Sequence, residues 1–264
     1  MSAFSAEWLS LREDADAAAR AVELLEPLRE HLGRGSIVVR DLGSGTGGMA
    51  RWLAGRLSGP QHWILHDHDP ELLAATTVPD TAADGAAVTV ETSLVEVSDL
   101  GDLHGTSLLT ASALLDLLTA NEVDALAESC ADARCPALLS LSVVGRVVLE
   151  PVDPLDAEVA EAFDAHQRRR TDSRQLLGPD AVSVATDSFA REGLEVRTAP
   201  SVWRLDRSAQ KLTEQWLRGW VDAASEQRPA LDLDAYLRRR LDDLAAGALR
   251  VEVHHADLLA LPSR

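Results

Sequence analysis

The chain has 264 residues with a formal net charge of −18, and hydrophobic residues make up 46% of it. This length suits one large α/β domain whose apolar content can fill a core. The acidic excess argues against a nucleic acid partner, because binding to phosphates draws on Lys and Arg, and Lys211 is the only lysine. No apolar run approaches the ~20 residues that a membrane span needs. The N-terminus lacks the pattern of a signal peptide, so we expect a cytoplasmic protein.

Apolar periodicity in the first half of the chain predicts alternating helices and strands. Ser5 is expected to cap a helix from Ala6 to Glu30. Thr119 and Glu122 form a capping box for the helix that follows the fourth strand. The fifth strand is almost continuous in apolar and small residues, which is typical of a central parallel strand buried on both faces. Strands are expected at residues 36–41, 61–66, 87–93, 108–111 and 137–144.

The C-terminal half continues the alternation, with two helices placed between its strands. The expected elements are helices at 155–169 and 178–193, a strand at 194–197 extended by 202–205, helices at 208–226 and 230–246, and a strand at 249–254. Strands that alternate with helices in this way predict a doubly wound, mostly parallel sheet. No Pro/Gly/Ser linker and no internal repeat interrupts the chain, so a single domain is expected.

The most informative stretch runs from Asp41 to Gly48, between an apolar strand and a helix-like run. Glycines at every second position of a strand-to-helix turn describe a loop whose backbone presses against a ligand, with free amides facing it. Gly43, Gly45 and Gly48 also fit the dinucleotide fingerprint, in which the helix start holds a pyrophosphate. Asp41 argues against that alternative, since its carboxylate would lie close to the phosphate charge. It suits the positive sulfonium and ammonium of S-adenosylmethionine instead.

The pattern Asp41-x-Gly43-x-Gly45-x-Gly47 resembles motif I of the class I S-adenosylmethionine-dependent methyltransferases. The expected second strand ends at Asp67, where that family has an acid that binds both ribose hydroxyls, and Asp69 is the neighbouring alternative. A carboxylate suits a vicinal diol because it accepts two hydrogen bonds at once. The resemblance is strongest over roughly residues 36–75, fair to about residue 145 and thin beyond.

The resemblance implies S-adenosylmethionine as the cofactor, held by the loops that follow the first four strands. After the third strand, Ser93 and Leu94 stand where the family often has an acid, which leaves the adenine contact unassigned. Asp116 is the one acid of an apolar segment after the fourth strand, and a buried carboxylate there could take a proton from the acceptor; a solvated helical turn is the alternative. The cofactor-binding candidates are Asp41, Gly43, Ser44, Gly45, Thr46, Gly47, Asp67, His68, Ser93, Leu94 and Ser112.

The family likeness further implies a Rossmann-like methyltransferase fold of seven strands, whose last strand runs antiparallel beside the fifth. Residues 1–35 would form an N-terminal helix or lid, 36–150 the cofactor-binding half, and 151–264 the substrate-side half with a helical insertion at about 208–246. The expected function is in-line methyl transfer to a small-molecule acceptor. An NAD(P)-dependent oxidoreductase and a non-catalytic S-adenosylmethionine-binding or interaction protein are the alternatives. The acceptor and the oligomeric state, homodimer included, stay open.

Two further groups of side chains are expected to be structural. Residues 66–69 read His-Asp-His-Asp, but successive residues of a strand point to opposite sides, so no metal site is expected there. Cys130 and Cys135 lack the partners that a closed metal site would need. We therefore expect two buried thiols.

Overall fold

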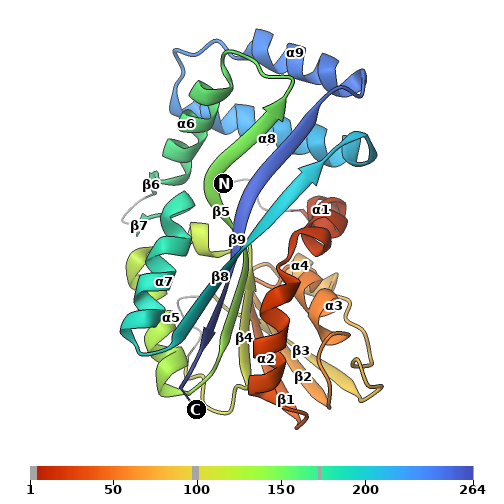
Figure 1. Cartoon of the computed structure of the whole chain (residues 1–264), viewed down its shortest axis with the longest axis vertical. Helices are drawn as coiled ribbons and strands as arrows, with labels where there is room; N and C mark the ends of the chain where they lie inside the picture. The colour runs from red at the N-terminus through yellow and green to blue at the C-terminus, as the bar shows by residue number, and fades with distance from the viewer. Residues whose placement is uncertain (1–4, 97–100, 172–173, 264) are drawn as a thin grey trace.

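Seven strands form one sheet in the computed structural model of the chain (Figure 1), which describes residues 5–96, 101–171 and 174–263. The strand order is β3-β2-β1-β4-β5-β9-β8, with β1 to β5 parallel and β9 antiparallel to both of its neighbours. The last strand thus lies between the fifth and the sixth of this sheet, and the predicted fold class is confirmed. The strands are β1 (Ile37–Leu42), β2 (Gln61–Asp67), β3 (Val88–Leu94), β4 (Leu108–Ser112), β5 (Ala137–Glu150), β8 (Glu195–Leu205) and β9 (Arg250–Leu261).

Helices cover both faces of the parallel part of the sheet (Figure 1). On one face, α5 (Ala120–Asp132) and α7 (Ala181–Arg191) enclose a core that contains Phe189 and both cysteines, which are free and buried as expected. On the other face, α2 (Leu25–Leu32) and α3 (Gly48–Ala54) pack on a core around Trp63. Strands buried on both faces explain the continuous apolar run of β5.

Beyond the parallel sheet, β5, β8 and β9 continue as an antiparallel ribbon that carries three helices (Figure 1). These are α6 (Asp156–Gln167), α8 (Gln210–Gln227) and α9 (Asp234–Ala245). Their apolar faces share a third core with the ribbon, in which Trp203, Trp220 and Tyr236 are buried. The helices α8 and α9 are the predicted insertion before the last strand.

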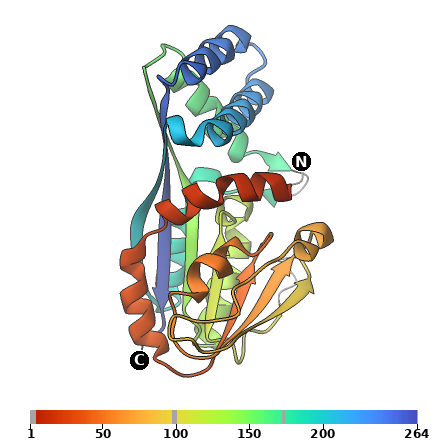
Figure 2. The same ribbon diagram turned by 90° about the vertical axis from the view of Figure 1, so that its right-hand side faces the viewer.

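The expected single helix from Ala6 to Glu30 is wrong, because the chain bends after α1 (Ala6–Ala19). Arg20 leaves the helical conformation with φ −55° and ψ 137°, and the next N–H, of Ala21, donates to the Asp257 carboxylate at 2.9 Å. A short 3₁₀ turn, Val22–Leu24, then leads into α2. Figure 2 shows the result, with α1 lying across the ends of the central strands and α2 running beside the sheet.

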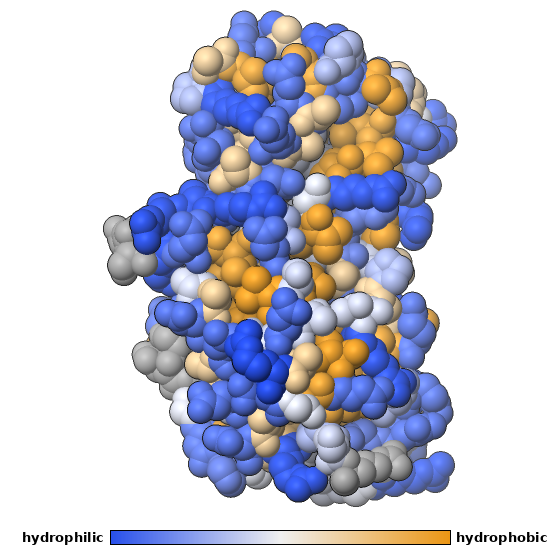
Figure 3. All heavy atoms as spheres, turned by 60° about the vertical axis from the view of Figure 1, so that its left-hand side comes forward, coloured by the Kyte–Doolittle hydropathy of each residue, from blue (hydrophilic) through white to orange (hydrophobic). Residues whose placement is uncertain are grey.

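The remaining elements are short and connect the main layers. They are α4 (Pro70–Ala74), the 3₁₀ turns Leu115–Leu117, Gly178–Asp180 and Arg207–Ala209, and the two-stranded β6 (Arg170–Thr171) and β7 (Arg174–Gln175). Hydrophilic side chains dominate the face drawn in Figure 3, where hydrophobic ones gather in separate patches. Within the described part of the chain, no helix has both the length and the apolar character to cross a membrane.

Candidate functional site

The turn from β1 to α3 adopts a conformation that its alternating glycines make accessible. Gly43, Gly45 and Gly47 have φ values of 57°, 54° and 85°, in the left-handed region that other residues rarely adopt. Gly48 is not in that region, and a Cβ added to it would meet nothing closer than Arg51 Nη2 at 3.7 Å. The conformation therefore requires glycine at the positions that resemble motif I and does not require the third glycine of the dinucleotide fingerprint.

Asp41 lies beneath this loop near the carboxyl end of β1, 1% exposed. Its Oδ1 accepts a hydrogen bond from Thr110 Oγ1 at 2.7 Å, because β1 and β4 place these two residues side by side. Oδ2 is buried and has no partner among the described residues. Burial raises the pKa of Asp41 to about 7, although the Thr110 hydroxyl and the Arg20 charge both oppose this shift.

The two acids near the end of β2 have different roles in the structure. Asp67 is buried, and its Oδ2 accepts from the N–H of Gly45 at 2.8 Å, which ties the end of β2 to the glycine loop. Asp69 instead caps α4, where its Oδ1 accepts from the N–H groups of Glu71 and Leu72. Of the two, only Asp67 lies against the loop. That Asp67 binds ribose stays a prediction.

Parallel strands end at one edge of the sheet, and the other predicted residues lie at or near that edge. Ser93 and Leu94 end β3, beside Asp67. The side chain of Leu94 is 63% exposed, and His68 is also exposed. Within the loop, the Ser44 hydroxyl is buried without a partner among the described residues, and Arg51 binds both the carbonyl and the hydroxyl of Thr46.

Arg20 is a candidate that the sequence analysis missed. It is 5% exposed and donates through Nη2 to the Ser112 hydroxyl at 3.1 Å, at the end of β4, while its Nε has no partner in the part of the chain that the structure describes. Its guanidinium carbon lies 5.3 Å from the centre of the Trp52 ring. Burial lowers the pKa of Arg20, and Asp16, Asp257 and Asp41 act against this shift. The only sequence signal for Arg20 is its position directly after a run of alanines.

Asp116 lies on the 3₁₀ turn after β4 and is partly exposed. Burial raises its pKa to about 6, and the positive charge of Arg12, on α1, partly offsets this. A carboxylate with that pKa is mostly ionised at neutral pH and is still basic enough to take a proton. That Asp116 acts as a base on the acceptor side stays a prediction.

Comparison with known proteins gives structural neighbours only. No family model matches the sequence, and no curated protein matches it. The cyclopropane synthase MmaA2 from Mycobacterium tuberculosis shares 11% identity and a TM-score of 0.49, over 90% of this chain and 83% of that one. A putative methyltransferase from Bacillus halodurans shares 12% identity and a TM-score of 0.49, over 92% and 100%. A putative sarcosine dimethylglycine methyltransferase from Galdieria sulphuraria shares 14% identity and a TM-score of 0.43, over 91% and 84%.

The strand order decides the fold. Five parallel strands, followed by a last strand inserted antiparallel between the fifth and the sixth, are joined here to a motif I turn after β1. The chain has the class I methyltransferase fold. In open α/β sheets of this type, ligands bind beyond the carboxyl ends of the strands, and β1, β2 and β4 place Asp41, Asp67 and Ser112 at or near those ends.

In this methyltransferase fold, α1 covers the glycine loop. A Cβ added to Gly45 would lie 2.7 Å from Leu9 Cδ1, so the Leu9 side chain rests directly on the loop. Glu13 fixes the helix through paired hydrogen bonds from Arg51 Nε and Nη2, at 2.5 and 2.8 Å. Between α1 and α3 lies a cavity of about 200 Å³. Its lining includes Glu13, Arg20, Gly48, Arg51 and Trp52.

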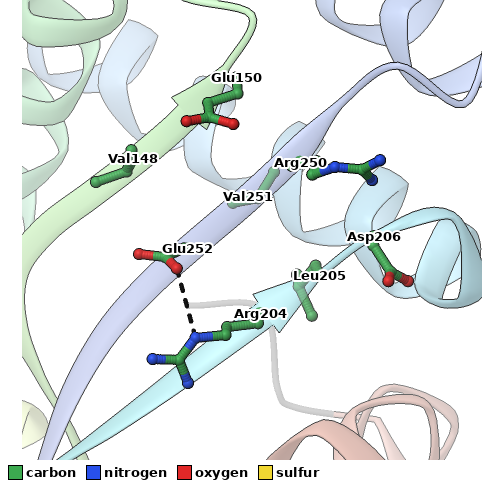
Figure 4. A pocket seen from close by; sticks show the side chains of 8 residues that line it. All are labelled: Val148, Glu150, Arg204, Leu205, Asp206, Arg250, Val251 and Glu252. Carbon is green, nitrogen blue, oxygen red and sulfur yellow. Dashed lines mark ion pairs between the residues drawn. The ribbon is translucent and has the colours of Figure 1, made fainter.

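A second cavity, of about 370 Å³, lies on the ribbon and shares no residue with the predicted site (Figure 4). Arg204 Nε lies 3.4 Å from Glu252 Oε1 across its floor. The lining mixes acidic and basic side chains on three neighbouring strands, and none of its side-chain atoms is buried without a partner. Nothing in this hollow calls for a ligand, so the carboxyl edge of the sheet is the stronger candidate site.

Proposed function

We propose that this chain is an S-adenosylmethionine-dependent methyltransferase that acts on a small-molecule acceptor. The observation that carries the proposal is a pair of buried, opposite charges beside the glycine loop, each with an atom that has no partner among the described residues. These are Asp41, through Oδ2, and Arg20, through Nε. A buried polar atom without a partner is rare and costly in a native protein, so both atoms are expected to be satisfied by a ligand.

The methionine end of S-adenosylmethionine fits this pair. It carries an α-ammonium, which suits the Asp41 carboxylate, and an α-carboxylate, which suits a guanidinium. Nicotinamide dinucleotides have no amino acid group, and the helix glycine that would favour them, Gly48, is not conformationally required. The remainder of the cofactor would extend toward Asp67, with Ser93, Leu94 and His68 next to the adenine.

The charge balance of this buried region also favours a cation. Asp16 forms an ion pair with Arg12 at 2.9 Å. This leaves Asp41 and Asp257 against the single positive charge of Arg20. S-adenosylmethionine carries one net positive charge, from its sulfonium, ammonium and carboxylate. Its binding would offset the excess negative charge of the buried carboxylates, whereas binding of the neutral product S-adenosylhomocysteine would not.

In methyl transfer, the main contributions of the protein are to align the acceptor atom with the departing sulfur and to exclude water. Helix α1 would exclude water on the cofactor side. Asp116 would accept a proton from an acceptor hydroxyl, a role that an acceptor entering as a neutral amine would not need. Residues 151–264 would shape the acceptor side through α6, α8 and α9.

Calorimetric titration with S-adenosylmethionine, S-adenosylhomocysteine and NADH tests the proposal without knowledge of the acceptor. Binding of the first two ligands and not of NADH is expected. NADH binding alone would replace the proposal with an oxidoreductase. Binding of S-adenosylmethionine with no transfer across a broad screen of phenols, alcohols, amines and thiols would favour the non-catalytic alternative.

A further inference from the structure

Asp257 is a buried carboxylate, 1% exposed, that is not proposed to touch the cofactor or the acceptor. It accepts three hydrogen bonds from three different elements. Its Oδ1 accepts from the N–H of Leu141 in β5 at 2.7 Å and from the hydroxyl of Ser201 in β8 at 2.6 Å. Its Oδ2 accepts from the N–H of Ala21, just after α1, at 2.9 Å. One side chain of β9 thus joins β5, β8 and the residue that follows the end of α1.

Two of these donors belong to residues next to Arg20 or next to the pairing partner of its acceptor, Ser112. Ala21 follows Arg20 in the chain, and its N–H is free for Asp257 because the helix ends at Arg20. Leu141 has a φ of 57° where the pairing of β5 with β9 shifts register. It follows Ser140, which is the pairing partner of Ser112, the residue that accepts from Arg20.

Stabilising the core does not by itself explain a carboxylate at position 257. Burying a carboxylate is costly, and burial raises the pKa of Asp257. An apolar side chain at this position would continue the run of Leu258, Leu259 and Ala260, which are all buried. A carboxylate here fixes the backbone of Ala21, next to Arg20, and that of Leu141 in β5. Its charge also favours the ionised form of the nearby guanidinium.

We propose that Asp257 is a positioning residue, which holds Arg20 in the place where it binds the amino acid end of the cofactor. The inference rests on the proposed function. It predicts that Asp257 affects the binding of ligands that have an α-amino acid group and leaves the binding of ligands without one unchanged. S-adenosylhomocysteine and 5′-methylthioadenosine form such a pair, since they share the adenosine and the sulfur.

The test is calorimetric titration of the full chain and of Asp257→Asn with both ligands. An amide can still accept from Leu141 and Ser201, but its NH₂ group cannot accept from the N–H of Ala21. Loss of a hydrogen bond to a charged group predicts about tenfold weaker binding of S-adenosylhomocysteine, with the affinity for 5′-methylthioadenosine unchanged. An equal loss of affinity for both ligands, or no loss for either ligand, would overturn the positioning role.

Ala21→Pro tests the same bond from the donor side and serves if Asp257→Asn does not fold. The φ of Ala21 is −73° and the ψ of Arg20 is 137°, values that suit proline and the residue before it. The same selective loss is expected.

Ser201→Ala is the matched control, because it removes another donor to Asp257 and leaves the Ala21 bond in place. The ratio of its affinities for S-adenosylhomocysteine and 5′-methylthioadenosine should equal that of the unmodified chain. A selective loss in Ser201→Ala would contradict the assignment. Failure of the unmodified chain to bind S-adenosylhomocysteine would overturn the proposed function instead.

Discussion

At the scale of single residues, burying the Asp41 carboxylate costs the free protein stability. Burial raises its pKa to about 7 in the folded state, well above the value of about 4 expected in an unfolded chain. The folded state therefore favours the protonated form. The stability from this preference is fully present below about pH 4 and is lost as the pH rises through about 7. A cationic ligand favours the ionised form, so binding and stability respond to pH in opposite directions.

Asp41→Asn should separate these two effects. At pH 8 the melting temperature of the free variant is expected to exceed that of the unmodified chain, because the uncharged amide avoids the cost of a buried carboxylate and can still accept from Thr110. Affinity for S-adenosylmethionine should fall by roughly tenfold to a hundredfold, the effect of losing a charged hydrogen bond. Thermal denaturation and calorimetry measure the two quantities.

The pH dependence of binding follows from the same residue. Affinity of the unmodified chain for S-adenosylmethionine should rise between pH 6 and pH 8, as Asp41 loses its proton near pH 7. In Asp41→Asn this rise should be absent. A pH profile shared by both proteins would assign the titration to another group.

Asp116→Asn addresses the acceptor side. Once an acceptor hydroxyl is known, the variant should retain its affinity for the cofactor and slow transfer by about a hundredfold or more, as loss of a general base does. The rate of the unmodified chain should rise as the pH passes about 6, where the Asp116 carboxylate ionises. Parallel losses of affinity and rate would point to a structural role.

At the scale of elements, the glycine loop and the bend after α1 show how local sequence and tertiary contacts share control. The loop could be predicted because glycine adopts the left-handed backbone of a tight strand-to-helix turn without the strain that a Cβ would cause. Pro27 disfavours a single helix from Ala6 to Glu30, but local sequence does not place the bend at Arg20, seven residues earlier. The Asp257 carboxylate, more than two hundred residues away in the chain, takes the Ala21 N–H and favours the break.

Gly45→Ala and Gly48→Ala form a matched pair at this scale. Gly45 is left-handed, so alanine there is strained by about 1–2 kcal/mol, and its methyl would push the Leu9 side chain off the loop; cofactor binding should weaken by about tenfold. Gly48→Ala meets only Arg51, at 3.7 Å, and should bind normally. Calorimetric titration of both variants with S-adenosylhomocysteine measures the difference in affinity. A stronger defect in Gly48→Ala would revive the dinucleotide alternative.

At the scale of the whole molecule, the ribbon and its three helices form a core separate from those of the parallel sheet. Trp220 lies at its centre, 1% exposed, stacked on Trp216 at 5.3 Å and near Tyr236. The two tryptophans of α8 therefore contribute to packing. This core carries α6, α8 and α9, and α1, which covers the glycine loop, packs against it through Trp8 and Leu11.

Trp220→Ala should lower the free energy of unfolding by about 3–5 kcal/mol, the typical effect of deleting a large buried side chain. Urea denaturation monitored by circular dichroism measures it. Affinity of the folded variant for S-adenosylhomocysteine should change little, because α1 packs on this core but is also held at the glycine loop by the Glu13–Arg51 pair. A large loss of affinity would show that the ribbon core and the glycine loop are coupled.

The sequence by itself determined the alternation of strands and helices, the strand that carries Asp41, and the turn after it, because these depend on periodicity and on local backbone preferences. The tertiary structure decided what local patterns do not encode. It placed Asp69 as a helix cap and Asp67 against the loop, and it brought Arg20 and Asp257 together from opposite ends of the chain. Both sit in the sequence as single charged residues among apolar or alanine-rich neighbours. Only long-range packing of α1 on the sheet buries Arg20 where the charges of both Asp41 and Asp257 act on it.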